Sequence, residues 1–88
     1  MVPTVPTKDA PRSVSLEVVR RLRQERIRRG ISLNQLAGKA GLSRSMVSYV
    51  ERGMRNPTLD TLLRMAEALK LDLWKTIKRA STKRSSTR

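Results

Sequence analysis

Four hydrogen-bonding side chains stand close together near the middle of the chain: Arg44, Ser45, Ser48 and Tyr49. Their spacing puts them on one side of a short helix, because residues three and four apart share a helix face. An arginine can donate paired hydrogen bonds to guanine O6 and N7, a serine can reach several base edges, and a tyrosine can touch a thymine methyl group or a phosphate. These residue types at this spacing indicate hydrogen-bonded recognition of base pairs.

The remaining composition argues against catalysis. The 88 residues include no cysteine and no histidine, which removes thiol chemistry, disulfides and the commonest general base and metal ligand. The serines have no histidine to activate them, and the seven acidic residues fall singly along the chain. We therefore expect a protein that is not an enzyme, with no catalytic residue, no metal site and no cofactor.

The charge of the chain indicates a polyanionic partner. Twenty Lys and Arg residues against seven Asp and Glu give a formal net charge of +13, which makes nucleic acid the first candidate. A membrane surface is also anionic, but no stretch approaches the ~18 apolar residues of a membrane span, and the basic helices lack anchoring Trp and Phe. No apolar signal segment follows Met1. We expect a cytoplasmic, nucleoid-associated protein of prokaryotic or phage type.

A short helix must precede the one that carries these side chains. Ser32 followed three residues later by Gln35 forms a capping box, in which each side chain satisfies a backbone N–H of the first turn. Gly41 then stands where the chain must reverse through a left-handed residue. The apolar stripe of this helix is Leu36, Ala37 and Ala40.

The second helix begins after a new N-cap, Ser43, and ends at Gly53. Val47 and Val50 repeat at helical spacing and can face a core, which turns Arg44 and Tyr49 outward. A helix that reads the major groove needs this division, with short and hydrogen-bonding side chains near its N-terminus and the opposite face in the core.

Three further helices flank this pair. Ser13 or Ser15 can cap a first helix that ends just before Gly30, Thr58 can cap a fourth, and Asp72 a fifth. Residues 1–14 hold three prolines and no sustained periodicity, so we expect a disordered N-terminal arm. Residues 80–88 are expected to form a basic disordered tail, which leaves 15–79 as the folded domain.

The order of residues in this region resembles the helix-turn-helix of phage repressors and Cro, the xenobiotic-response-element type. The resemblance extends over roughly residues 18 to 77. It implies an all-α, five-helix, lambda-repressor-like DNA-binding domain with the helix-turn-helix at helices 2 and 3. The length of the chain is similar to that of restriction-modification controller proteins and small phage repressors. The residues that carry the resemblance are Ala37, Gly41, Leu42, Val47 and Val50, then Glu51-Arg52-Gly53 and Asn56-Pro57.

The resemblance implies a role for each site residue. Bases would be contacted from a recognition helix over residues 43–52, and Arg26 would pair with Glu51 as structural scaffolding. The implied activity is that of a homodimeric, sequence-specific regulator of transcription that binds a palindromic operator in double-stranded DNA, as a repressor or an autoregulator. The base-contacting residues would be Arg44, Ser45, Ser48 and Tyr49, and those contacting the DNA backbone Ser43, Arg52, Arg55 and Asn56.

A dimer interface is expected around Trp74, with Met54 and Met65 as lesser members. This follows because the aliphatic residues of the fourth and fifth helices can fill the interior, leaving these three as large apolar side chains on polar faces. In the alternative, Trp74 folds back over the first helix. The residues expected to fill the interior are Leu59, Leu62, Leu63, Leu69, Leu73 and Ile77.

Three other interpretations remain open at this stage. An antitoxin-type or other protein-interaction module could use the same fold to hold a protein partner. A general nucleic-acid packaging protein would bind unrelated DNA sequences equally. A plain helical bundle would use Gly41 only as a turn.

Overall fold

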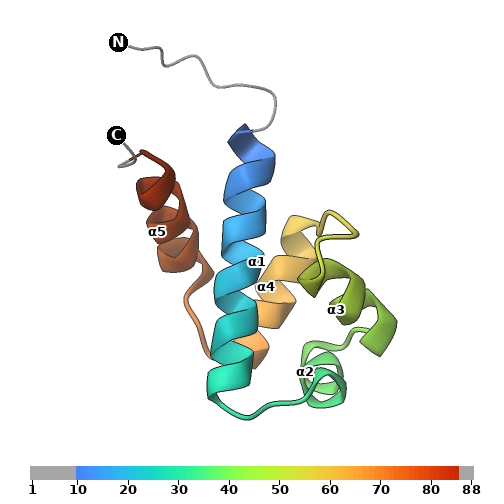
Figure 1. Ribbon diagram of the computed structural model, residues 1–88. Coiled ribbons are helices and arrows are strands. Elements are labelled where there is room, and N and C mark those ends of the chain that lie inside the picture. The colour runs from blue at the N-terminus through green and yellow to red at the C-terminus, as the bar shows by residue number, and fades with distance from the viewer. Residues whose placement is uncertain (1–9, 86–88) are drawn as a thin grey trace.

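The computed structural model describes residues 10–85, which form five α-helices and no strand (Figure 1). This confirms the predicted all-α, five-helix fold. Within the described residues no helix has the length and apolar character that a membrane crossing requires. The helices are α1 (Ala10–Arg28), α2 (Leu33–Ala40), α3 (Arg44–Glu51), α4 (Leu59–Ala68) and α5 (Leu73–Ser85).

Side-chain caps start the four later helices where the sequence predicted them. Ser32 Oγ accepts from the amide of Gln35 at 3.0 Å, while Gln35 Oε1 accepts from the Ser32 amide at 2.8 Å, which completes the capping box. Ser43 and Thr58 accept in the same way from the third residue of α3 and α4, each at 3.0 Å. Asp72 Oδ1 accepts from the amide of the third residue of α5 at 3.3 Å.

The first four helices end in the same way, with a left-handed residue followed by two backbone hydrogen bonds back into the last turn. In α3, Gly53 (φ 73°) donates to Val50 and the next residue, Met54, donates to Tyr49. This is the Schellman arrangement, and it satisfies carbonyls that the helix end leaves without partners. The corresponding left-handed residues after α1, α2 and α4 are Gly30, Gly41 and Lys70. Only Lys70 has a Cβ to accommodate there.

Helix α1 is the central element of the molecule. It packs against α5 on one side and against α3 and α4 on the other, while α2 packs against α3 and α4 (Figure 1). One core lies between these helices. Its largest fully buried side chains come from α1 to α4 and from the residue that follows α4: Val18, Leu22, Leu36, Val47, Val50, Met65 and Leu69.

The expected orientation of α4 was wrong in part, since Leu62 and Leu69 are buried as expected but three other residues are not placed as expected. Met65, expected at a dimer surface, has no exposed area and lies in the core, whereas Leu59 and Leu63, expected inside, are 62% and 49% exposed. The helix is turned about its axis so that its buried face also includes the capping-turn residue Thr61. Leu59 stands at the first position of α4, next to the loop from α3, where the chain has not yet reached the core.

The expected ends of α1 and α5 also differ from the structure. Helix α1 begins at Ala10, so residues 10–14 are helical and neither Ser13 nor Ser15 is an N-cap; residues 1–9 of the expected arm lie outside the described part. Helix α5 continues to Ser85, and Ala80 in it is fully buried. The expected tail therefore begins inside a helix that the core needs.

Candidate nucleic-acid interface

Helix α3 has a core face and a solvent face. Val47 and Val50 are fully buried, and they fix the rotation of the helix about its own axis. The N-cap Ser43 and the Gly41 turn, whose φ is 70°, set where α3 begins relative to α2. The two short helices thereby form the helix-turn-helix over residues 33–51, supported from behind by α1 and α4.

The structure places the four predicted base-contacting side chains on α3. Arg44 and Ser45, in the first turn, are exposed, and neither side chain has a hydrogen bond or ion pair among the described residues. Tyr49 is 38% exposed one turn further on, and Ser48 beside it is half-buried. Their donors and acceptors are therefore available to a ligand, in the part of the helix that enters the groove in major-groove readers.

The predicted backbone-contacting residues border this face. Ser43 uses its Oγ to accept from the amide of Met46, which leaves the hydroxyl hydrogen free to donate. The guanidinium of Arg52 lies 5.8 Å from the centre of the Tyr49 ring, a distance at which a cation is attracted to the aromatic face. Arg55 and Asn56 are exposed in the loop between α3 and α4.

A buried ion pair joins the C-terminal end of α3 to α1. Arg26 donates from Nε to Glu51 Oε2 at 2.7 Å and from Nη2 to Glu51 Oε1 at 2.9 Å, and the two side chains are 12% and 3% exposed. The third nitrogen of Arg26 donates to the Ile31 carbonyl at 2.8 Å. One guanidinium therefore connects α1, the α1–α2 connection and α3. Arg26 and Glu51 are the pair that the family resemblance implied.

Sequence reasoning missed a second arginine at this junction. Arg23 Nε lies 3.6 Å from Glu51 Oε1, and its side chain is 55% exposed. Its position three residues before Arg26 is the signal that would have found it, because residues three apart share a helix face. The junction thus carries two arginines on one carboxylate, and the outer one remains open to solvent beside α3.

The expected interface residues separate into two groups. Trp74 and Met54 are 70% and 66% exposed, so Trp74 does not fold back over α1. Met65 is buried and does not belong to the surface. Leu63 is exposed instead, and it lines an apolar groove of 360 Å³ between α4 and α5 together with Leu71 and Leu73.

Comparison with known proteins gives the class to which this arrangement belongs. Residues 22–73, more than half of the chain, match the helix-turn-helix family profile. The chain belongs to the helix-turn-helix family, of the Cro and phage-repressor type. The matched segment includes Arg26, α2, α3 and the Glu51 end of the ion pair.

Particular relatives are named as regulators. An HTH-type transcriptional regulator of Mycobacterium tuberculosis is 40% identical over 50 residues, which are 57% of this chain and 36% of that protein. The HTH-type transcriptional regulator SlrR of Bacillus subtilis is 40% identical over 53 residues, 59% of this chain and 35% of SlrR. The chain spans about a third of the length of these two relatives.

Two solved structures share the fold over more of their length. The restriction-modification controller protein C.AhdI of Aeromonas hydrophila has a TM-score of 0.64 and 39% identity, over 69% of this chain and 92% of that chain. The hypothetical transcription factor NHTF of Neisseria has a TM-score of 0.66 and 27% identity, over 88% of this chain and 86% of that chain.

Proposed function

We propose that this protein is a sequence-specific regulator of transcription that binds double-stranded DNA with residues 43–52 in the major groove. The observation that carries the proposal is the division of α3. Val47 and Val50 are buried, whereas the side chains of Arg44, Ser45 and Tyr49 are exposed and make no hydrogen bond within residues 10–85. Family membership and the regulators among its relatives support the same function.

Arg44 is the principal reader of sequence in this proposal. It stands at the first position of α3, and its guanidinium can donate two hydrogen bonds to guanine, the commonest specific contact in the major groove. Ser45, Ser48 and Tyr49 contact neighbouring bases. Ser43, Arg52, Arg55 and Asn56 grip the sugar–phosphate backbone on either side and fix the register.

The active form in this proposal is a homodimer on a palindromic operator. Trp74 is the main support, because a tryptophan 70% exposed on a highly charged small domain leaves a large apolar surface in water. Leu73, the residue before Trp74, lines the apolar groove together with Leu63 and Leu71. In this proposal the groove supplies further apolar surface for the partner copy. A two-fold axis would set the recognition helices about 34–36 Å apart, one turn of the duplex.

Selection of bound sites from random duplex DNA tests the function directly. The expected product is a palindrome whose half-sites have centres separated by about one helical turn, roughly 10–10.5 base pairs, or by a multiple of it. Arg44→Ala protein taken through the same selection should lose the preference at one position of each half-site.

Two outcomes of that selection would overturn the proposal. Recovery of unrelated sequences with equal affinity would favour general nucleic-acid packaging. Failure to enrich any DNA, together with a stoichiometric protein partner that co-purifies with the chain, would favour the antitoxin-type interaction module.

A further inference from the structure

Six arginines lie at positions 20–29, in the second half of α1 and just after it, and five of them donate hydrogen bonds to a glutamate. The exception is Arg23. Its Nε lies 3.6 Å from Glu51 Oε1, which is beyond hydrogen-bond range, and it makes no hydrogen bond within the described part of the chain. The N–H donors of Arg23 are therefore available to a ligand. The five paired arginines are Arg20, Arg21, Arg26, Arg28 and Arg29.

Glu51 does not need the charge of Arg23. Both of its carboxylate oxygens accept hydrogen bonds from Arg26, at 2.7 and 2.9 Å, and its side chain is 3% exposed. One guanidinium already neutralises this carboxylate, so Arg23 adds an excess positive charge to the junction. The Arg23 side chain is 55% exposed against 12% for Arg26, which puts the excess charge on the solvent side.

Arg23 stands at the end of the face of α3 that is proposed to read bases. Glu51 follows Arg44 by seven residues and Ser48 by three, a spacing that places these three on one side of the helix. Glu51 is the last residue of α3, and the next residue, Arg52, is proposed to grip the DNA backbone. Because sugar–phosphate strands border the major groove, we expect a duplex that receives this face to bring a strand to the helix end beside Arg23.

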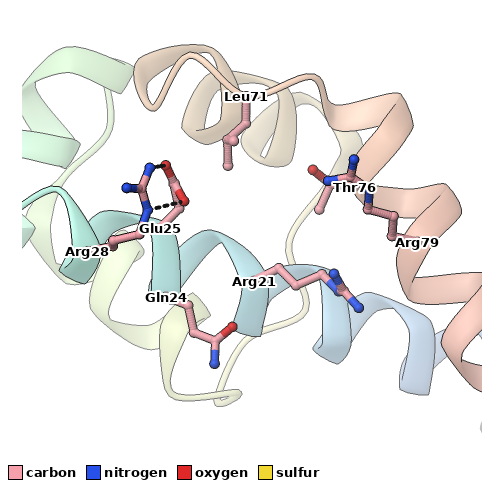
Figure 2. Close-up of a pocket in the computed structure, with 7 residues that line it drawn as sticks. All are labelled: Arg21, Gln24, Glu25, Arg28, Leu71, Thr76 and Arg79. Atoms are coloured by element: carbon pink, nitrogen blue, oxygen red, sulfur yellow. Dashed lines mark hydrogen bonds and ion pairs between the residues drawn. The ribbon is translucent and has the colours of Figure 1, made fainter.

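The paired arginines Arg21 and Arg28 lie on another side of α1. They line the hollow between α1 and α5, and Figure 2 shows Arg28 joined to Glu25 by two dashed hydrogen bonds. Helices α3 and α5 lie on opposite sides of α1 (Figure 1). Arg28 is thus an exposed arginine of the same helix, beside a glutamate but away from α3, and it serves as a matched control for Arg23.

We infer that Arg23 is a DNA-backbone contact supplied by α1, whose guanidinium donates to a phosphate oxygen while Arg26 keeps Glu51 neutralised. This inference rests on the proposed DNA-binding function and adds a residue from outside the helix-turn-helix to the contacts. A guanidinium can donate two hydrogen bonds to one phosphate, and such a contact does not depend on base sequence. Turning toward the phosphate breaks no structural hydrogen bond of Arg23, because it makes none within the described residues.

The test compares Arg23→Gln, Arg23→Lys and Arg28→Gln with the wild type on the selected duplex at several salt concentrations. Arg23→Gln should reduce the salt slope by about 0.9, the value for one phosphate neutralised. A slope of ~0.9 over the tenfold range from 1 M to 0.1 M salt amounts to about eightfold in affinity, which is the loss expected at 0.1 M. Arg23→Lys should restore most of the slope because it retains the charge. Arg28→Gln should bind as the wild type does.

Phosphate ethylation interference locates the contact on the DNA. One phosphate in each half-site should interfere with wild-type binding when it is ethylated and should no longer interfere with Arg23→Gln. The remaining phosphates should keep their effect in both proteins. Equal losses of affinity and slope in Arg23→Gln and Arg28→Gln would reduce the effect to overall charge and overturn the inference.

Two further outcomes would also overturn the assignment of Arg23. A loss of affinity accompanied by a lower urea midpoint, and not restored in Arg23→Lys, would make Arg23 a structural support of Glu51. A changed sequence preference in Arg23→Gln would make it a reader of bases. Failure of the wild type to bind any duplex is a separate result, because it overturns the proposed function and the inference with it.

Discussion

The side chain of Arg44 does not stabilise the described part of the fold, so its replacement should change DNA recognition and leave the fold intact. Its side chain is exposed and makes no hydrogen bond or ion pair within residues 10–85. We predict that Arg44→Ala weakens binding to the selected site by about 1–3 kcal/mol, the worth of a bidentate base contact, and changes binding to scrambled DNA little. Fluorescence anisotropy on matched and scrambled duplexes measures both.

Lys75→Ala is a suitable control for this experiment. Lys75 is exposed on α5 rather than on α3, and its replacement removes the same single positive charge. Lys75→Ala should weaken binding to the matched and the scrambled duplex slightly and equally. If Arg44→Ala did the same, Arg44 would be a phosphate contact and the assignment of the base reader would be wrong.

The Arg26–Glu51 pair should be worth more to the fold than any surface ion pair of the chain. Both side chains are nearly buried, and removing one partner of such a pair costs about 3–5 kcal/mol because a charge is left without compensation. Glu51→Ala should therefore be more damaging than Arg26→Ala, since Arg23 at 3.6 Å still partners Glu51 in the latter.

Urea unfolding of the two single variants and the double variant gives the coupling energy between Arg26 and Glu51. We expect the double variant to be clearly more stable than the sum of the single losses predicts. A coupling energy near zero would mean that the two groups behave as independent solvated charges.

At the scale of the element, local signals predicted helix starts well. The caps at Ser32, Ser43, Thr58 and Asp72 depend on one side chain and a backbone amide three residues away, so a sequence contains all the information needed. The first turns of α1 have no such cap, and the last turns of α5 have no apolar periodicity beyond Ala80. Their helical state therefore could not be found from these signals.

The rotation of α4 could not be predicted for a different reason. Leu62 can form a helical stripe with Leu59 and Leu63 or a second stripe with Met65. Helical periodicity therefore permits either stripe to be the buried face. The choice between them is made by the surfaces of α2, α1 and α5 against which α4 packs. Periodicity defines the buried face of α3 without ambiguity, because Val47 and Val50 lie three residues apart and the other apolar residue beside them, Met46, also packs against the core.

Glycine should be more favourable than lysine at position 70, the left-handed residue that follows α4. Lys70 holds φ 56° in a Schellman turn whose counterparts in the three preceding helices are glycines. A left-handed residue with a Cβ costs roughly 1–2 kcal/mol, of which the greater unfolded-state entropy of glycine cancels about 0.5–1 kcal/mol. Lys70→Gly should therefore raise the free energy of unfolding by up to about 1 kcal/mol in urea titrations.

Lys39 provides the matched comparison, since it is also an exposed lysine near a helix end but has helical φ and ψ. Lys39→Gly should lower stability by up to about 1 kcal/mol. Loss of stability in both variants would indicate that the Lys70 side chain contributes contacts that outweigh its backbone strain.

The last turns of α1 contain an acid whose titration should be displaced. Hydrogen bonds from Arg28 and Arg29 lower the pKa of Glu25 to about 2 from an ordinary value of 4.5. A carboxyl whose pKa is lower in the folded protein adds stability that is fully present above pH ~4.5 and is lost as the pH falls toward ~2. A carboxyl-carbon NMR titration should give a Glu25 midpoint well below 4.5, and Arg28→Gln should move it upward.

At the scale of the whole molecule, replacing the exposed Trp74 and the buried Met65 should have opposite effects on dimerisation and on stability. Trp74→Ala should give a folded monomer in sedimentation equilibrium with unchanged helical circular dichroism, because the side chain is 70% exposed and supports the proposed partner contact. Met65→Ala should cost about 2–5 kcal/mol of stability as a cavity in the core, while the folded fraction remains dimeric. A dimer that persists in Trp74→Ala would exclude this interface.

The side chains that would touch bases and the groups that hold α3 in place are different sets of residues. Among the residues that the structure describes, the side chains of Arg44 and Ser45 make no hydrogen bond to the fold, whereas Ser43, Val50 and Glu51 hold α3 by a cap, by burial and by an ion pair. Exchanging the outward residues therefore leaves the frame unaltered. We therefore predict that a library varied at positions 44, 45, 48 and 49 yields variants that bind new DNA sequences, with few members lost to misfolding.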